Sequence, residues 1–408
     1  MRQKLSSTCL MRVRKWLLFA TGKTITDVKE ANALYMDNMN VLKLLVVVSS
    51  LCLALAGCAE SSGKNTDILQ IECDELNISS LAPELVDRVS YLALECPSHA
   101  VVGRIDEIKF VEDMMYVADY KSNKIFAYGL DGSFVGVLMR QGRGPGEYIE
   151  IQTFDVDDKS LYVLDNAVNK LIVYDRNTFQ YVRESKLNLD AWDFEVLDNG
   201  GILFAYAPMA GNRKKDSEVR YRILVVDSDM NICDRYFAYG QDECDAFSLR
   251  HYLSESDGEI LYSSLNEDGF HVFSQSDGSL KKSVHIKFAN PMPSDSRSDF
   301  SQMREAKYTY QMRSPLKCGN IMAFMIAING EGQSVLADQS MNFYVNSKES
   351  LRNNLFSVIG SNRDCLVADW QSSGIYDFMI DRGFDRAVPD VEALIHEDNP
   401  YLVFYHLK

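Results

Sequence analysis

Residues 103–148 read GRIDEIKFVEDMMYVADYKSNKIFAYGLDGSFVGVLMRQGRGPGEY. Four short runs rich in apolar residues are separated by turn sequences at Glu112-Asp113, Ser122-Asn123 and Asp131-Gly132. An Asp-Gly pair between two such runs is a strong β-hairpin signal. The stretch therefore predicts four antiparallel strands joined by tight turns and followed by a glycine-rich segment.

The pattern of this stretch starts again further along the chain. Residues 161–165 (LYVLD) follow 115–119 (MYVAD), and residues 169–174 (NKLIVY) follow 123–128 (NKIFAY), both at an offset of 46. A constant offset across two separate strands, at a period of about 40–50 residues, is typical of β-propeller blades. The two copies are therefore predicted to be consecutive blades.

Looser copies fill the rest of the chain. Strands are predicted at 201–206, 222–227 and 232–237, at 259–263, 270–274 and 280–288, at 320–327, 334–337 and 342–345, and at 355–359, 365–370 and 375–380. The segments 89–95 and 401–406 are predicted to share the last blade, because an unpaired sheet edge promotes aggregation. The expected fold is all-β: a six-bladed β-propeller of four-stranded antiparallel blades, closed by its N- and C-terminal strands. One helical insertion is expected near 294–313, after two prolines.

The amino-terminal region predicts export. Residues 39–57 contain a lysine followed by an apolar stretch and small residues, which is the pattern of a signal peptide. The alternative, a transmembrane helix, is disfavoured because the polar run ESSGKNT follows directly. Residues 55–58 (LAGC) resemble the lipobox of bacterial lipoproteins, and the resemblance implies lipidation of Cys58 and anchoring in the cell envelope, at the outer membrane. Residues 1–38 are interpreted as a start-site artefact or an extended leader, 58–66 as a tether and 67–408 as the propeller.

The chain is acidic. Its formal net charge is −16, and residues 59–408 carry 34 Lys and Arg against 55 Asp and Glu. Such a surface repels phosphate backbones, so nucleic acid is not expected as a partner. A cationic ligand or a neutral glycan remains compatible with this charge, which is also explained by solubility alone.

Two segments carry a family resemblance. Residues 116–132 (YVADYKSNKIFAYGLDG) resemble an NHL-type propeller repeat. The GRGPGEY segment, the opening YLALEC and GRIDEI segments and the closing EDNPYLVFYHLK (397–408) are similar to uncharacterised six-bladed β-propeller lipoproteins of Gram-negative anaerobes. The resemblance implies the architecture, export and ligand binding, but no particular reaction.

Five polar residues are candidate ligand-binding positions. Arg143 and Glu147 lie in the glycine-rich segment, where the backbone can approach a ligand closely. Asp119, Asp165 and Asp369 end the second strands of their blades, and in NHL-type enzymes such strand ends carry metal or substrate groups. The alternative is structural: glycine and proline are ordinary turn residues, and an aspartate at a strand end accepts hydrogen bonds from the following turn. Trp192, Trp370 and the tyrosines are candidates for stacking on sugars, with packing between blades as the alternative.

No cofactor or metal is expected. The six histidines show neither an HxH nor an HExxH spacing, and no GxSxG nucleophile motif occurs. Six cysteines follow Cys58, and of these Cys233 and Cys244 are a candidate disulfide, with free thiols as the alternative.

These patterns together predict an exported, lipid-anchored propeller that binds a ligand or partner at the cell envelope. Its expected partners are the membrane, through Cys58, and a glycan, peptide or protein. An enzyme, either a lyase or a hydrolase acting at the central channel, is the first alternative. A structural component of an envelope complex is the second, because the propeller fold by itself does not decide between these functions.

Overall fold

A computed structural model describes residues 67–73, 77–79, 85–187, 191–208, 220–240, 243, 245, 249–303, 307–346, 358–363, 365–370, 372–381 and 383–408. They belong to one compact unit, Thr66–Lys408. The predicted signal peptide and Cys58 lie outside the described residues.

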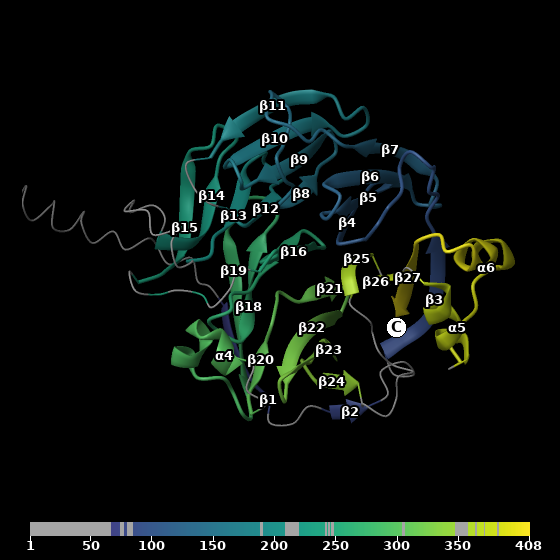
Figure 1. Ribbon diagram of the computed structural model, residues 1–408. Helices are drawn as coiled ribbons and strands as arrows, with labels where there is room; N and C mark the ends of the chain where they lie inside the picture. The colour runs from purple at the N-terminus through teal and green to yellow at the C-terminus, as the bar shows by residue number, and fades with distance from the viewer. Residues whose placement is uncertain are drawn as a thin grey trace, which may run out of the picture. The chain divides into compact units, whose positions relative to one another are not determined.

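The described strands form six sheets, and each sheet is one blade (Figure 1). Blade 1 contains β4 (Glu107–Val111), β5 (Met114–Asp119), β6 (Lys124–Gly129) and β7 (Phe134–Leu138). Blade 2 contains β8 (Thr153–Val156), β9 (Ser160–Asp165), β10 (Lys170–Asp175) and β11 (Tyr181–Lys186). In both blades each strand pairs antiparallel with the next, as the repeat in the sequence predicts.

Blades 3 and 4 follow the same order, and each contains an innermost strand that the sequence patterns missed. Blade 3 contains β12 (Asp193–Val196), β13 (Ile202–Ala205), β14 (Tyr221–Val226) and β15 (Ile232–Ala238). Blade 4 contains β16 (Leu253–Ser256), β17 (Glu259–Tyr262), β18 (Gly269–Ser274) and β19 (Leu280–Phe288). The missed strands β12 and β16 are four residues each, too short to show a clear alternation.

Blades 5 and 6 complete the propeller. Blade 5 contains β20 (Thr309–Gln311), β21 (Leu316–Cys318), β22 (Ile321–Ile328), β23 (Glu331–Ala337) and β24 (Phe343–Asn346). Blade 6 contains β25 (Val358–Asn362), β26 (Cys365–Trp370), β27 (Tyr401–Leu407) and β3 (Val86–Ala93). The antiparallel pairing of β27 with β3 confirms that an early strand and the last strand close one blade.

Two further strands precede β3. The strand β1 (Asp67–Cys73) pairs parallel with β19 at the outer edge of blade 4, and β2 (Asn77–Ser79) pairs parallel with β24 at the outer edge of blade 5. With β3 on blade 6, the segment before blade 1 covers the outer edges of three consecutive blades. Covering a sheet edge satisfies backbone groups that would otherwise pair with another chain.

The helices correct part of the prediction. The insertion after the two prolines is shorter than expected: a 3₁₀-helix η2 (Ser294–Ser298) and α4 (Phe300–Met303) are followed by β20. Residues 375–380, expected to be a strand, lie in α5 (Ser373–Asp381), which is followed by α6 (Pro389–His396). The strand prediction is wrong because β27 and β3 already fill the two outer positions of blade 6, so α5 packs Tyr376 and Met379 onto that blade instead.

The blades pack face to face around a common centre. The innermost strands contact one another in ring order, from β4 through β8, β12, β16, β21 and β25 back to β4 (Figure 1). Between blades 1 and 2, the buried rings of Tyr116, Tyr148, Phe154 and Tyr174 share one core. Burying a side chain of this size stabilises the fold by about 1.5–3 kcal/mol. This packing holds the innermost strands side by side. No helix in the described part of the chain is long and apolar enough to cross a membrane.

Candidate functional site

Charged residues alternate along the innermost strands. Glu107 and Lys109 lie on β4, and Asp193 and Glu195 lie on β12. Residues two apart on a strand project from the same face, so each pair presents two polar side chains in one direction. All four residues are charged or titratable in strands whose other positions are apolar, so the polar face of the innermost strands points toward the ring centre.

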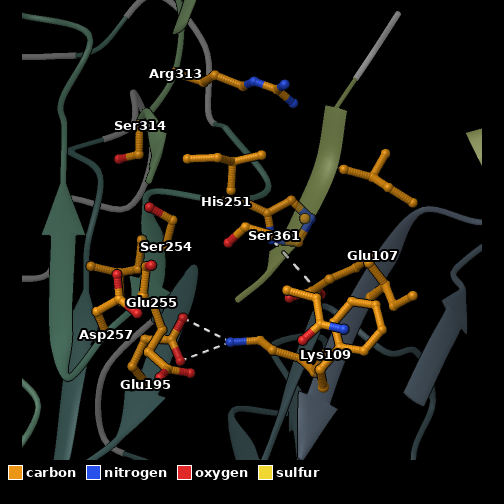
Figure 2. Close-up of a pocket in the computed structure, with 18 of the residues that line it drawn as sticks. Glu107, Lys109, Glu195, His251, Ser254, Glu255, Asp257, Arg313, Ser314 and Ser361 are labelled. Carbon is orange, nitrogen blue, oxygen red and sulfur yellow. Dashed lines mark hydrogen bonds and ion pairs between the residues drawn. The ribbon is translucent and has the colours of Figure 1, made fainter. Parts of the chain in front are cut away.

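A cavity of about 240 Å³ lies at the centre of the ring. Five of the six blades or their connections contribute to its lining, which includes Glu107 and Lys109, Glu195, His251, Ser254, Glu255 and Asp257, Arg313 and Ser314, and Ser361 (Figure 2). Ligand sites of propellers and barrels form where several elements converge in this way. We call this space the channel cavity.

Lys109 is at the centre of an ion-pair network. Its Nζ lies 2.8 Å from both carboxylate oxygens of Glu195 and 3.2 Å from Oδ1 of Asp155. Burial alone would lower the pKa of Lys109, but the charges of Asp155 and Glu195 outweigh it and raise the pKa well above its ordinary value. Lys109 is therefore a permanent cation in the wall of the channel cavity.

Glu107 lies on the same strand in a different environment. It accepts hydrogen bonds from the hydroxyl of Tyr120 and, at 3.4 Å, from that of Thr153, and Nδ1 of His251 is 3.8 Å away. Burial raises the pKa of Glu107 from its ordinary value of 4.5 to about 7, against the opposing charge of Lys109. Near neutral pH this carboxyl group can therefore either donate or accept a proton.

His251 faces Glu107 from blade 4. Burial, with a contribution from the charge of Arg250, lowers the pKa of His251 to about 4, although Asp193 opposes the shift. Arg250 is held over the ring of Tyr120, 4.2 Å from its centroid, and donates to the carbonyl oxygen of Gln152 at 2.6 Å. At neutral pH His251 is therefore an uncharged imidazole beside a carboxyl group that titrates near 7.

Two carboxylates of the innermost strands have a structural role. Asp155 accepts a hydrogen bond from the backbone N–H of Val196 at 2.7 Å, which joins blade 2 to blade 3. Asp193 accepts from the N–H groups of Tyr252 and Leu253 at 2.7 and 2.8 Å, which joins blade 3 to blade 4. These hydrogen bonds are sufficient to explain why a carboxylate is buried at each position, so no ligand is needed to account for it.

Asp119 and Asp165, which the sequence singled out, lie outside the lining of the channel cavity and make the same bond in two blades. Asp119 Oδ2 accepts from the N–H of Gly103 at 3.0 Å, and Asp165 Oδ2 accepts from the N–H of Ile149 at 2.6 Å. Each bond spans 16 residues, and the two bonds are related by the offset of 46. Both aspartates thus fix the connection that enters their own blade, as the structural interpretation predicts.

Arg143 and Glu147 lie together at a second cavity of about 480 Å³, also lined by Lys170, Glu184 and Lys186. Glu147 accepts from the N–H of Gly144 at 2.7 Å, which closes the turn. A Cβ atom at Gly142 would lie 2.0 Å from a Glu147 oxygen, so a larger residue there would displace the Glu147 carboxylate from this position. Arg143 itself is exposed.

Asp369 differs from the other two aspartates. In the described part of the chain its carboxylate receives no hydrogen bond from another residue, and burial raises its pKa to about 6. Asp106 on blade 1 adds to the shift and Arg104 opposes it. Asp369 is therefore near blade 1 but does not line the channel cavity.

The structure also places the tryptophans and cysteines that the sequence suggested as candidates. Trp192 packs in a core cluster of blades 3 and 4, while the side chain of Trp370 lies outside the described residues. Cys233 is exposed with a free thiol, which favours the thiol alternative; its proposed partner Cys244 lies outside the described residues. Across the described ranges, no group of three or more His, Cys, Asp or Glu side chains is placed to hold a metal ion.

The residues that form the channel cavity were not among the candidates from the sequence. A signal for part of it was present, because the offset of 46 aligns Glu107 with Thr153 and Lys109 with Asp155 at the start of successive blades. Polar residues at alternate positions of an otherwise apolar strand indicate a polar face. His251 and Arg313 carry no such signal, since each lies in an irregular segment before a strand.

Comparison with known proteins places the chain in a family. A protein of Bacteroides fragilis NCTC 9343, inferred to be exported, matches with a TM-score of 0.69 at 18% identity over 84% of this chain and 99% of its own. A member of the DUF4221 family from Bacteroides vulgatus ATCC 8482 matches with a TM-score of 0.46 at 10% identity, over 80% and 98% of the two chains. No curated protein matches the sequence. At 18% identity the first match shows a common fold and nothing about function. The family model described as 6-bladed beta-propeller (DUF5128) matches residues 60–317, more than half of the sequence, and the chain therefore belongs to this family.

Proposed function

We propose that the protein is an exported, lipid-anchored β-propeller that binds a small polar ligand in the channel cavity. The observation that carries the proposal is the lining itself: charged side chains from several blades converge on one cavity at the ring centre. Burying charged groups is costly unless they are paired or used, so such groups cluster at functional sites.

A purely structural role explains only part of this lining. Asp155 and Asp193 hold neighbouring strands together. Glu255 and Asp257, by contrast, line the cavity and make no hydrogen bond or ion pair with any described residue. Burial raises the pKa of Glu255, although the nearby charge of Lys109 opposes the shift. Their carboxylates are available to a ligand.

A binding experiment tests the site. Isothermal titration calorimetry of the full chain against amino acids, dipeptides, polyamines and neutral oligosaccharides is expected to find binding that weakens at least tenfold in the double variant E255Q/D257N. The matched control is D158N/D234N, which removes the same charge from exposed positions outside the cavity lining. Equal affinity of the two double variants, or no binding by any compound, would contradict the proposal. The second result would favour the structural-component alternative.

The membrane anchor is supported by the sequence of residues 39–58 and by the inferred export of the Bacteroides fragilis relative. The full chain is expected to incorporate labelled palmitate and to sediment with membranes, and the variant C58S is expected to do neither. Palmitate labelling that persists in C58S would overturn the anchor.

One observation favours an enzyme as the second candidate. Glu107, with a pKa of about 7, lies beside neutral His251 and the hydroxyl of Tyr120. A general acid or base works best when its pKa is near the working pH. If a ligand found by calorimetry is slowly cleaved, E107Q should abolish the cleavage, and the rate of the wild type should titrate near pH 7. If the ligand is still intact after prolonged incubation, the enzyme candidate is ruled out for this ligand and only the binding function is supported.

A further inference from the structure

Arg313 is the one strongly basic group of the cavity lining that is enclosed and lacks a carboxylate partner in the described part of the chain. Its Nη2 donates to the carbonyl oxygen of Val358 at 2.7 Å, and no ion pair is formed. Lys109, in contrast, is held by Glu195 and Asp155. Burial lowers the pKa of Arg313, with no nearby charge to offset it. A guanidinium carries five N–H donors and stays charged, so most of its binding capacity is unused here.

The negative charges of the cavity lie away from Arg313. Figure 2 shows Arg313 on one side of the cavity, beyond His251, and Glu195, Glu255 and Asp257 grouped on another side. Glu195 is paired with Lys109, and Asp106 with Arg104, while Glu107 is hydrogen-bonded to Tyr120. Glu255 and Asp257 are therefore the carboxylates of the lining that have no hydrogen bond or ion pair to a described residue, although the charge of Lys109 also acts on Glu255. The cavity thus has a separate cationic and anionic side.

This separation excludes several ligand classes. A phosphate would pair with Arg313 but would be repelled by the carboxylates of Glu255 and Asp257. A polyamine would pair with these carboxylates but would be repelled by Arg313. A neutral sugar would leave the guanidinium without a charged partner in an enclosed site. Arg363 also lines the cavity, but it is exposed, so an ion pair there is screened by water and contributes little.

We propose that the ligand of the channel cavity is a zwitterion, an amino acid or a short peptide, whose carboxylate is bound by Arg313 and whose ammonium group lies against Glu255 and Asp257. This inference rests on the proposed binding function. A planar carboxylate fits a guanidinium with two parallel hydrogen bonds, which gives both strength and orientation. A cavity of about 240 Å³ has room for a ligand of this size and not for a large one.

The test compares charge-deleted forms of one ligand. The full chain is titrated calorimetrically with the twenty amino acids and a set of dipeptides, and the tightest binder is then prepared as its C-terminal amide and as its N-acetyl form. The amide is expected to bind at least tenfold more weakly than the free acid, and so is the N-acetyl form. In R313Q the free acid should bind as weakly as the amide binds to the wild type, and amidation should cause no further loss.

The controls separate the inference from the binding function. R143Q removes an exposed guanidinium at the other cavity and should bind as the wild type does. R313K, which keeps the charge but not the paired geometry, should be intermediate. If R313Q fails to fold, the amide and N-acetyl comparison on the wild type still decides the question. An amide that binds as tightly as the acid, or binding confined to a neutral disaccharide or inorganic phosphate, would overturn the zwitterion while leaving the cavity as a binding site. Absence of binding by every compound would overturn both.

Discussion

The first three blades bury carboxylates in two regions, the ends of second strands and the channel wall, and use them in different ways. At the strand ends, Asp119 and Asp165 are bound by backbone N–H groups of their own blade. In the channel wall, Glu107 contacts the side chains of Tyr120 and His251, and Glu195 is paired with Lys109 of another blade. The partners at the strand ends lie 16 residues away, whereas Lys109 and Glu195 are 86 residues apart.

The difference shows how a buried charge can be assigned to structure or to function. A carboxylate saturated by nearby backbone donors has no capacity left for a ligand, and its role ends with the fold. A carboxylate beside a cavity whose partners are side chains of other blades is different. Its electrostatic environment, and therefore its pKa, changes when a ligand binds or a neighbouring group is protonated. Three measurements test whether the two kinds of buried carboxylate differ in this way.

Removal of the channel cation should have the largest effect. Lys109→Met leaves Glu195 and Asp155 without their counter-charge in a buried site, and breaking a buried ion pair costs about 3–5 kcal/mol. Urea unfolding of the full chain should show a correspondingly lower midpoint, while the exposed control K121M should stay near the wild type. Adding E195Q to K109M should recover part of the loss. A K109M protein as stable as K121M would mean that the network is not buried as described.

Substitution of the strand-end aspartates should have the second-largest effect on stability. Asp119→Ala removes the acceptor for the N–H groups of Gly103, Arg104 and Ser122. These three donors belong to exposed residues and can bond to water instead, so the expected loss is about 1 kcal/mol, the net value of an ordinary hydrogen bond. Asp165→Ala should lower the free energy of unfolding by a similar amount, and the affinity for the ligand should not change. Asp234→Asn is the control, since Asp234 is exposed and its unfolding midpoint should barely move. A weakened affinity in D119A or D165A at unchanged stability would instead support the ligand-binding interpretation of these residues.

The pH dependence of stability should show a smaller effect, carried by Glu107. Because burial raises its pKa from 4.5 to about 7, the folded protein keeps a proton that the unfolded chain loses above about pH 4.5. The contribution of Glu107 to stability therefore falls as the pH rises through this range, by at most about 3 kcal/mol above pH 7. His251, whose pKa is lowered to about 4, acts in the opposite direction between pH 4 and 6.5.

Comparison of E107Q with the wild type isolates the Glu107 contribution. The two proteins should have similar unfolding free energies near pH 4.5, and E107Q should become increasingly more stable up to about pH 8. A difference that does not depend on pH would show that Glu107 titrates in the folded state as it does in water.

Much of the fold was predictable from local patterns. The offset of 46 predicted that the second and third strands of blade 1 recur in blade 2, and the apolar runs at 89–95 and 401–406 predicted the closure that β3 and β27 form. The innermost strands β12 and β16 escaped because each has only four residues, so that even the alternation of DFEV in β12 is too short to identify a strand. The segment 375–380 was read as a strand because its apolar content fits either a strand or a helix, and only the occupied positions in blade 6 exclude the strand.

The candidate site was less predictable than the fold. Arg143 and Glu147 are candidate ligand-binding residues in the sequence because glycine and proline surround them. In the structure the glycines and the proline form a turn that Glu147 closes. The alternation of polar residues marks Lys109 and Glu195 only as part of a polar strand face, and the ion pair between them joins blades 1 and 3, which no local pattern indicates. Arg313 lies just before β21 with nothing in its neighbours to mark it.

The repeat, the turns and the membership of a six-bladed propeller family follow from the sequence, because each depends on residues close together in the chain. The tertiary structure decided which charges meet at the ring centre. Glu107, Glu195, His251 and Arg313 come from four different blades, and their separations depend on how each blade packs against the next. The burial that raises the pKa of Glu107 and lowers that of Arg313 exists only once the ring has closed.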